Sequence, residues 1–480
     1  MKYDVVIGLE VHVQVQTATK IFCRCPNRSG AAPNTLICPV CMGYPGVLPV
    51  PNREAVRKTI LAGLMCNCQI AEYSKFDRKS YFYPDMPKNF QTSQYDLPLC
   101  GRGYVQIAGS GFSGEELPAA EIGITRIHLE EDVGKSTHFG EYSGIDYNRA
   151  GVPLMEIVSE PDMTSPDQAY AYLTVLKQAM QYGGISDCDM EKGQLRCDVN
   201  VSLKPAGRTE LGAKIELKNL NSFKSIHRAL ESDIERQAAI LDGGGELFQE
   251  TRGWDDDLGD TYFLRRKEGD EDYRYFPEPD LMPMAIDNAW LEEIRAEVPE
   301  TPEKRRDRFV AQYGIPEYDA GVLTADRPVA DYYEETVGAG APAKKASNWI
   351  MVELMRELSQ ANVPITESPI TATALAQLVT AIESADITGR QAKDVFVDMF
   401  KTGNDLETVK TALNIVKTDD SEIRNWAREA IAANPKPVTE FKEGNEKSMN
   451  FLVGQVMKAS RGNANPQSAR DILIEELGKS

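Results

Sequence analysis

The sequence lacks the features that mark membrane-spanning and secreted proteins. Its uncharged stretch at 29–52 is interrupted by prolines at 33, 39, 45, 49 and 51, so it cannot form a helix that crosses a membrane. The amino-terminal Met1–Asp4 leads directly into a β-like run, without the apolar segment of a signal peptide. We therefore expect a cytoplasmic protein with no membrane-bound part.

Positive charge is also scarce. The chain has 53 Lys and Arg against 73 Asp and Glu, and its formal net charge is −20. This balance argues against a protein that coats nucleic acid non-specifically, although it leaves room for a tRNA bound through a local basic patch. An acidic chain can also collect carboxylates around divalent cations, but a solvated surface accounts for most acidic residues.

The nine cysteines are odd in number and do not form a disulfide framework. Four of them are grouped as Cys23, Cys25, Cys38 and Cys41. Two turns that each present two thiolates can close a tetrahedral zinc site, so the spacing predicts a structural zinc knuckle at 23–41. The alternative is a set of reduced thiols without metal. We predict that the other five cysteines are buried as small apolar residues.

Three segments alternate apolar residues with unusual polar ones, as strands do. They run over 9–15, 195–203 and 214–218. If the three strands share a sheet, one face gathers carboxylates, an imidazole and cations. Such a donor set favours a hard cation, magnesium or manganese. The alternative is that these faces merely meet water. The polar residues are Glu10, His12, Gln14, Arg196, Asp198, Asn200, Ser202, Lys214, Glu216 and Lys218.

The chain is long enough for two or three domains. A capping box at 165–168 and a stripe of apolar residues predict one helix, and a second helix is predicted from Phe223 to Leu241. Mixed strand and helix patterns predict an α+β domain at 1–292. Helical spacing alone continues after that point, which predicts a helical domain at 293–405. A joint at 434–437 lies within a small tail domain at 406–480.

A run of acids follows His128 and Leu129. The strand phase slips there, so the sequence does not decide whether Glu130 or Glu131 points inward. The Gly-Lys-Ser at 134–136 is not a phosphate-binding P-loop, because no glycine stands five residues before Gly134.

Seven strings in the chain resemble the B subunit of the tRNA-dependent aspartyl/glutamyl-tRNA amidotransferases. They occur in the family's order and span nearly the whole chain. They are IGLEVH at 7–12, DRKSYFYPD at 77–85, DYNRAGVPLME at 146–156, LRCDVNVS at 195–202, ELKNLNSF at 216–223, DYRYFPEPD at 272–280 and FLVGQVMK at 451–458.

The resemblance implies a fold and a reaction. It implies an antiparallel-sheet cradle of the glutamine synthetase and guanido kinase type, followed by all-α helical and tail domains. Such a protein uses ATP and magnesium to phosphorylate the side-chain carboxylate of glutamate or aspartate on a non-cognate tRNA. Ammonia from the separate amidase (A) subunit then displaces phosphate, and the small C subunit completes the heterotrimer. No residue reveals whether Glu-tRNA, Asp-tRNA or both are used.

The resemblance also implies site residues. The expected catalytic residues are Glu10, His12, Glu131 and Glu156, and the expected magnesium ligands are these four with Asp198 and Glu216. The expected ATP- and substrate-binding residues are Lys79, Tyr83, Lys88, Arg149, Arg196 and Lys218. The expected tRNA-binding residues are Lys447, Lys458 and Arg461. An ordinary surface ion pair is the alternative for each cation in the active-site set, and simple packing is the alternative for the tail.

Two other functions stay open at this point. The chain could be a non-catalytic tRNA-binding scaffold, in which the polar strand faces are only solvated. It could also be a self-sufficient ATP-dependent ligase that joins free ammonia to a small acid. Glu10 and His12 on one strand face favour catalysis, and the long helical part favours a macromolecular substrate.

Overall fold

The computed structural model describes residues 2–266, 273–415, 419–460 and 464–479. The chain forms two compact units, Met1–Thr301 and Pro302–Ser480. The first unit combines a large sheet with helices, and every regular element described in the second unit is helical. The predicted α+β class is therefore confirmed.

The first unit is built on an eight-stranded sheet with β1 near its centre. The strand order is β13-β12-β11-β10-β1-β9-β6-β5. In that order the strands are Asp260–Arg266, Glu250–Asp255, Ile215–Lys218, Leu195–Pro205, Tyr3–Gln14, Pro153–Ser159, Glu116–Glu131 and Gly103–Ser110.

The three strands predicted from alternation are neighbours in this sheet. β1 pairs antiparallel with β10 from Tyr3 to Val13, and β10 pairs antiparallel with β11. Leu9, Val11 and Val13 are buried in the core, as are their partners on β10. Because strand side chains alternate, the polar residues of all three strands share the opposite face.

The large sheet is antiparallel, as expected, except at one pair of strands. β11 and β12 run parallel, with Glu216 opposite Thr251. The chain between them passes through the helix α3 (Phe223–Asp242). A crossover of this kind returns the chain in the same direction, which a short hairpin cannot do.

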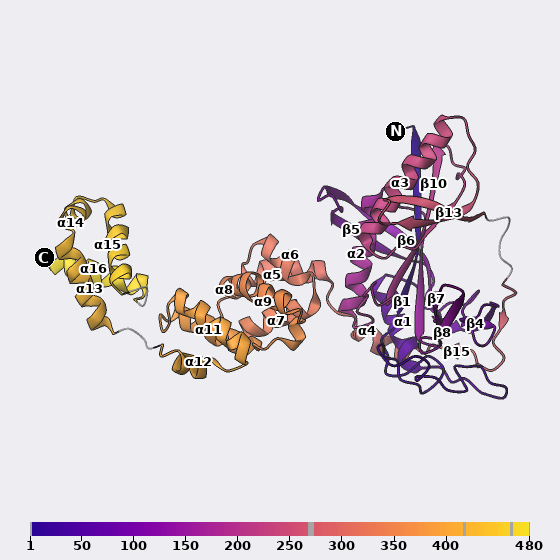
Figure 1. Cartoon of the computed structure of the whole chain (residues 1–480), viewed down its shortest axis with the longest axis horizontal. Helices are drawn as coiled ribbons and strands as arrows, with labels where there is room; N and C mark the ends of the chain where they lie inside the picture. Colours follow the sequence, from indigo (N-terminus) through magenta and orange to yellow (C-terminus); the bar gives the residue numbers. More distant parts are fainter. Residues whose placement is uncertain (1, 267–272, 416–418, 461–463, 480) are drawn as a thin grey trace. The chain divides into compact units, whose positions relative to one another are not determined.

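Helices cover the apolar face of the sheet. Figure 1 shows α2 (Pro166–Tyr182) and α3 along one side of it, while α1 (Arg53–Met65) packs on β6 and α4 (Asn288–Ala296) packs on α1. The predicted cap of α2 is present, because Ser165 Oγ accepts from the Gln168 N–H at 3.2 Å. With the helices on one face, the other face is available to polar side chains.

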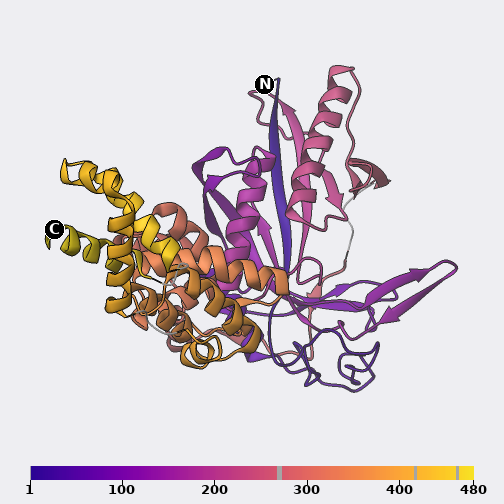
Figure 2. The ribbon, with the colours of Figure 1, turned by 60° about the vertical axis from the view of Figure 1, so that its left-hand side comes forward.

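Short strands and a long loop form the rest of the first unit. β14, β3 and β4 make a three-stranded sheet, β15 pairs with β2, and β7 pairs with β8 in a hairpin. The hairpin projects from the body of the unit in Figure 2. These strands are β2 Tyr73–Ser74, β3 Asp77–Ser80, β4 Phe90–Ser93, β7 Lys135–Phe139, β8 Tyr142–Asp146, β14 Phe276–Pro277 and β15 Met284–Ala285.

The second unit contains two separate hydrophobic cores. Residues 309–409 form the first core. Its elements are α5 Pro302–Tyr313, α6 Glu317–Thr324, α7 Arg327–Gly338, α8 Ala343–Asn348, a π-helical segment Trp349–Leu354, α9 Met355–Ala361, a 3₁₀ turn Ile365–Glu367, α10 Ala372–Glu383, α11 Gly389–Thr402 and α12 Leu406–Ala412.

Residues 423–477 form the second core of this unit. Its helices are α13 Asp420–Ala433, α14 Pro435–Lys442, α15 Glu446–Ala459 and α16 Pro466–Lys479. Of the joint predicted at 434–437, only Asn434 separates two helices, because α13 ends before it and residues 435–437 form the first turn of α14. Nowhere in the described residues does a helix combine the length and apolarity needed to cross a lipid bilayer.

Candidate functional site

A row of polar side chains crosses the exposed face of the large sheet. Strand pairing places His128 on β6 opposite Glu156 on β9, Glu156 opposite His12 on β1, and His12 opposite Arg196 on β10. Directly paired residues have side chains about 5 Å apart, so neighbours in the row contact one another. Two of the chain's 4 histidines are thus concentrated in one row.

Two imidazoles and two carboxylates meet at one end of this row. His12 Nε2 lies 3.5 Å from Glu156 Oε2 and 3.9 Å from Glu130 Oε1. His128 Nε2 lies 3.3 Å from Glu156 Oε2 and 3.5 Å from Glu130 Oε2. Ser93 Oγ on β4 donates to Glu130 at 3.0 Å and fixes that carboxylate.

The ligand atoms of His12, Glu130 and Glu156 all lie within 4.8 Å of one another. This set, which we call the His/Glu cluster, can hold one metal ion. Two carboxylates and a single imidazole favour a hard divalent cation over zinc. The geometry therefore suits the magnesium expected from the strand faces.

The charges within the His/Glu cluster are strongly coupled. Burial lowers the pKa of His12, but Glu156 and then Glu130 outweigh it and raise that pKa above its usual value. At His128 the same carboxylates outweigh burial and raise the pKa to about 9. Burial raises the pKa of Glu156, yet His128 and His12 hold it well below its ordinary range. The two carboxylates thus favour positive charge on the neighbouring imidazoles, and a metal ion bound to His12 would displace its proton.

A second carboxylate group lies further along the same face. Glu10 pairs with Asp198 across β1 and β10, and Glu10 accepts from Asn200 Nδ2 at 3.0 Å. Lys218 Nζ lies 2.6 Å from Asp198 and 3.3 Å from Glu216. Glu10, Asp198 and Glu216 therefore share the polar face, with Lys218 held between the last two.

Several buried polar atoms on this face lack a hydrogen-bond partner among the described residues. They are His128 Nδ1, Arg196 Nε and Asn200 Oδ1. A buried polar atom is normally satisfied, so atoms of this kind mark positions for water, an ion or a bound ligand.

The Glu131 side chain does not lie beside His12 and Glu156, where we expected it. Its carboxylate contacts Lys88 Nζ and accepts from the Thr92 N–H at 2.7 Å. Successive strand residues point in opposite directions, so Glu130 and Glu131 cannot both face the cluster. Glu130 occupies the position that had been expected for Glu131.

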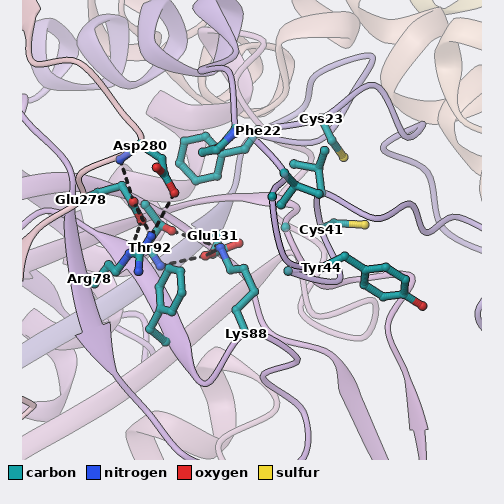
Figure 3. A pocket seen from close by; sticks show the side chains of 17 residues that line it. Phe22, Cys23, Cys41, Tyr44, Arg78, Lys88, Thr92, Glu131, Glu278 and Asp280 are labelled. Carbon is teal, nitrogen blue, oxygen red and sulfur yellow. Dashed lines mark hydrogen bonds and ion pairs between the residues drawn. The ribbon is translucent and has the colours of Figure 1, made fainter.

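Glu131 instead lines a cavity of about 210 Å³ between the cysteine loop and the small sheet (Figure 3). Arg78 in this cavity makes a forked contact with Glu278 at 2.7 and 2.8 Å and reaches Asp280 at 3.1 Å. Phe22, Cys41 and Tyr44 form the wall on the side of the cysteines.

Two of the predicted arginines converge on a residue that the sequence did not single out. Asp132 is 1 % exposed and accepts from Arg196 at 2.9 Å and from Gln14 at 2.8 Å. Arg149 Nε lies 3.7 Å from the same carboxylate and donates to the Val133 carbonyl, while its Nη2 donates to the Gly134 carbonyl. Asp132 thus orients cations beside the His/Glu cluster.

The remaining predicted residues are spread out. Lys79 lies over the ring of Tyr273 at 4.6 Å, and Tyr83 is exposed beside Tyr81. Lys447 and Lys458 are exposed on α15, in the other unit. Arg461 lies outside the described residues.

His128 is a member of the site that sequence reasoning missed. A usable signal was present, because Ile127 and Leu129 are apolar and alternate with His128 and Glu130. Continued alternation would have placed His128 and Glu130 on one face and Glu131 on the other.

The four grouped cysteines lie close together, and we call them the four-cysteine cluster. All nine cysteines are free thiols, and the ligand atoms of Cys23, Cys25, Cys38 and Cys41 lie within 4.8 Å of one another. The sulfurs of Cys38 and Cys41 are 3.9 Å apart. Tetrahedral zinc with bonds of about 2.3 Å separates its sulfurs by about 3.8 Å. The other five cysteines are buried, as predicted.

Comparisons with known proteins show which family this chain belongs to. Residues 5–292 match the family model described as the GatB/GatE catalytic domain, and residues 331–477 match the GatB domain. The aspartyl/glutamyl-tRNA(Asn/Gln) amidotransferase B subunit of Carboxydothermus hydrogenoformans is 51% identical over 484 residues, covering 100% of this chain and 99% of the relative. The proteins of that name from Thermoanaerobacter pseudethanolicus and Moorella thermoacetica are 50% and 48% identical, covering 100% and 99% of this chain and 100% of each relative. The chain therefore belongs to the GatB family, the B subunits of the aspartyl/glutamyl-tRNA(Asn/Gln) amidotransferases.

Proposed function

We propose that this chain uses ATP and magnesium to phosphorylate the side-chain carboxylate of glutamate or aspartate on a non-cognate tRNA. Ammonia then replaces the phosphate and leaves the amide. The ammonia comes from glutamine, hydrolysed by the separate amidase (A) subunit, and the small C subunit completes the heterotrimer. The names of the curated relatives, which are amidotransferases for aspartyl- and glutamyl-tRNA, support this substrate class.

The observation that carries this proposal is the row His128, Glu156, His12 and Arg196 across four strands. Phosphoryl transfer from ATP to a carboxylate brings two anions together. The reaction therefore needs metal and cationic side chains positioned in advance. The row supplies metal ligands at one end and a guanidinium at the other.

Each part of the face has a role in the proposal. His12, Glu130 and Glu156 hold a magnesium ion, and Glu10, Asp198 and Glu216 offer carboxylates to the same ion or to a second one. Bound magnesium would neutralise charge on the phosphoryl oxygens. The catalytic set is accordingly Glu10, His12, Glu130 and Glu156.

Cations and aromatic residues around the cluster are assigned to substrates. Arg196 and Arg149, both oriented by Asp132, would hold phosphate or the aminoacyl end. Lys79, Lys88 and Lys218 are further candidates for these anions, and Tyr83 is a candidate for stacking on the terminal adenosine.

The remaining proposals concern the architecture. We assign residues 1–292 to a cradle domain of the glutamine synthetase and guanido kinase type, 293–405 to a helical domain and 406–480 to a tRNA-binding tail. Three separate hydrophobic cores support a division into three parts, although the first core includes Ile294 and the second extends to Val409, both past the proposed boundaries. Lys447 and Lys458 on α15, with Arg461, would contact the tRNA backbone.

The four-cysteine cluster is assigned to structural zinc. Four thiolates satisfy a tetrahedral ion and leave no position for a reacting group. Zinc there would hold the loop that forms one wall of the cavity near Glu131.

The proposed reaction is tested by ATP turnover of the purified heterotrimer with Glu-tRNA(Gln), with uncharged tRNA and with free glutamate. We expect ADP to form only with the misacylated tRNA, because its carboxylate is the phosphoryl acceptor. Conversion of free glutamate to glutamine by this chain alone would favour a self-sufficient ligase instead.

A comparison of two histidine variants makes this test specific to the proposed site. We expect His12→Ala to lower ADP formation by about 10²–10³-fold, the usual loss when one preorganised group is removed. His138→Ala is the matched control, because His138 is exposed on the β7–β8 hairpin. Equal activity of the two variants would remove His12 from the mechanism.

A further inference from the structure

Lys20 is a lysine with no access to solvent, at the start of the loop that carries the four cysteines. Its side chain is 0 % exposed. Lys20 Nζ donates to Cys41 Sγ at 3.8 Å and to the Tyr147 carbonyl at 3.3 Å. Among the described residues, no carboxylate oxygen lies within 4.0 Å of this nitrogen, the distance that defines an ion pair.

Two other largely shielded lysines of the first unit have carboxylate partners. Lys88 contacts Glu131, and Lys75 contacts both Asp77 and Asp96. Removing an ammonium from water costs several kcal/mol, and buried lysines are therefore paired with negative charge. The Tyr147 carbonyl does not supply such a charge, so the charge must come from the sulfur side of Lys20.

The sulfurs of the four-cysteine cluster can supply the missing charge. Four thiolates around one divalent zinc ion carry a net charge of about −2. A buried ammonium in contact with Cys41 Sγ is therefore a feature that fits a metal-loaded cluster.

Lys20 also connects the cluster to the turn that leads into β9. Its second partner, Tyr147, belongs to that turn, and the Ile21 N–H donates to the Gly151 carbonyl at 2.9 Å. Gly151 lies against the contact between lysine and cysteine. A Cβ at this glycine would lie 3.4 Å from Cys41 Cβ and 3.7 Å from Lys20 Cδ.

We propose that Lys20 is the buried counter-charge of the zinc-loaded four-cysteine cluster, and that it positions the cluster against the turn at 147–151 and slows loss of the metal. This role rests on the zinc assigned under the proposed function. Without the ammonium, the excess negative charge of four thiolates is left uncompensated away from water. The N–H···S contact also draws electron density from the Cys41 sulfur.

The test uses zinc-loaded full-length chain and follows transfer of the metal to an excess of a coloured chelator. We expect Lys20→Met and Lys20→Gln to release zinc about tenfold or more faster than the unaltered chain, the usual effect of losing a partner of a metal ligand. Lys20→Arg keeps the charge and is expected to release zinc more slowly than either. Lys58→Met is the matched control, because Lys58 donates to the Gly184 carbonyl at 2.6 Å and contacts no sulfur.

Cobalt replacement separates an electronic role from simple filling of space. We expect the thiolate-to-cobalt charge-transfer band to move to lower energy in Lys20→Met and Lys20→Gln, because the sulfur loses its hydrogen bond. An unaltered chain without zinc would overturn the zinc assignment itself. Bound zinc with unchanged release rates and an unchanged band in Lys20→Gln would overturn the role of Lys20 alone. If Lys20→Met does not fold, the comparison of Lys20→Gln with Lys20→Arg tests the role of Lys20. Equal rates of zinc release from these two variants would contradict a role as counter-charge.

Discussion

Glu130 and Glu131, the last two residues of β6, have identical side chains and different surroundings. Glu130 meets His12, His128 and Ser93, whereas Glu131 meets Lys88 and the Thr92 N–H. The difference arises because neighbouring residues of a strand face opposite ways. One carboxylate therefore belongs to the His/Glu cluster, and the other is paired with a lysine.

These neighbours allow a sharp test of the metal site. We expect Glu130→Gln to lower magnesium-dependent phosphorylation of Glu-tRNA by about 10²–10³-fold, because a charged ligand is lost where transition-state charge develops. Glu131→Gln should lower phosphorylation far less, because the Glu131 carboxylate contacts Lys88 and does not face the His/Glu cluster. ADP formation by the heterotrimer without glutamine measures this step, and equal losses in the two variants would contradict the assignment.

Part of the site could be predicted at the level of single residues. The alternation in β1 and β10 correctly placed Glu10, His12 and Asp198 on one face. Asp132 could not be found in this way, because its partner Arg196 is 64 residues away in the sequence. Periodicity predicts which side chains share a face, whereas contacts between distant segments depend on how the strands are ordered.

At the level of elements, local signals predicted α2 and α3, whereas α1 was not predicted. Ser165 and Ser222 cap α2 and α3 through hydrogen bonds within one turn. The parallel pairing of β11 with β12 was not predictable, since it depends on where α3 returns the chain. The two-residue strands β14 and β15 are also defined only by their partners β3 and β2.

One contact between helices makes the second unit sensitive to acid. Asp319 on α6 accepts from Lys344 Nζ at 2.6 Å and from Ser347 Oγ at 2.7 Å, both on α8. Burial raises the pKa of Asp319, but these two partners outweigh it and hold the pKa below its usual value. The stabilisation is therefore complete above the unfolded pKa of about 3.9 and is lost as the pH falls through the folded value.

We expect Asp319→Asn to lower the local unfolding free energy of α6 and α8 by about 1–3 kcal/mol at pH 6.5, the usual contribution of hydrogen bonds to a charged group. The difference from the unaltered chain should shrink at pH 3.5. Hydrogen-exchange mass spectrometry of peptides from the two helices measures it in the full-length chain. A difference that stays constant between the two pH values would show that the carboxylate charge is not involved.

At the level of the whole molecule, three hydrophobic cores account for a chain of 480 residues. Composition and spacing predicted a mixed amino-terminal part and helices after it, because strand and helix periods differ. The family resemblance contributed the reaction, which no periodicity contains.

Because the chain as a whole is acidic, any surface that binds tRNA must be a local group of basic residues. Lys447 and Lys458 stand about three helical turns apart on α15, so they lie on one face of it.

We expect Lys447→Ala together with Lys458→Ala to raise KM for Glu-tRNA and leave kcat unchanged, because the tail is remote in sequence from every residue of the His/Glu cluster. The slope of log Kd against log salt should fall by about one for each lysine–phosphate interaction removed. Lys401→Ala, an exposed lysine on α11, is the control. Unchanged tRNA binding in the double variant would favour a tail that only packs.

The central position of β1 has a consequence for folding during synthesis of the chain. β1 leaves the ribosome well before both of its neighbours, β9 and β10. Asn200, which donates to Glu10, follows Glu10 by 190 residues. At about 5–20 residues per second this interval lasts about 10–40 s. During that time Leu9, Val11 and Val13 have no partner strand, so the nascent chain depends on shielding from aggregation. The strand that carries Glu10 and His12 is synthesised before its neighbours and can pair only after they emerge.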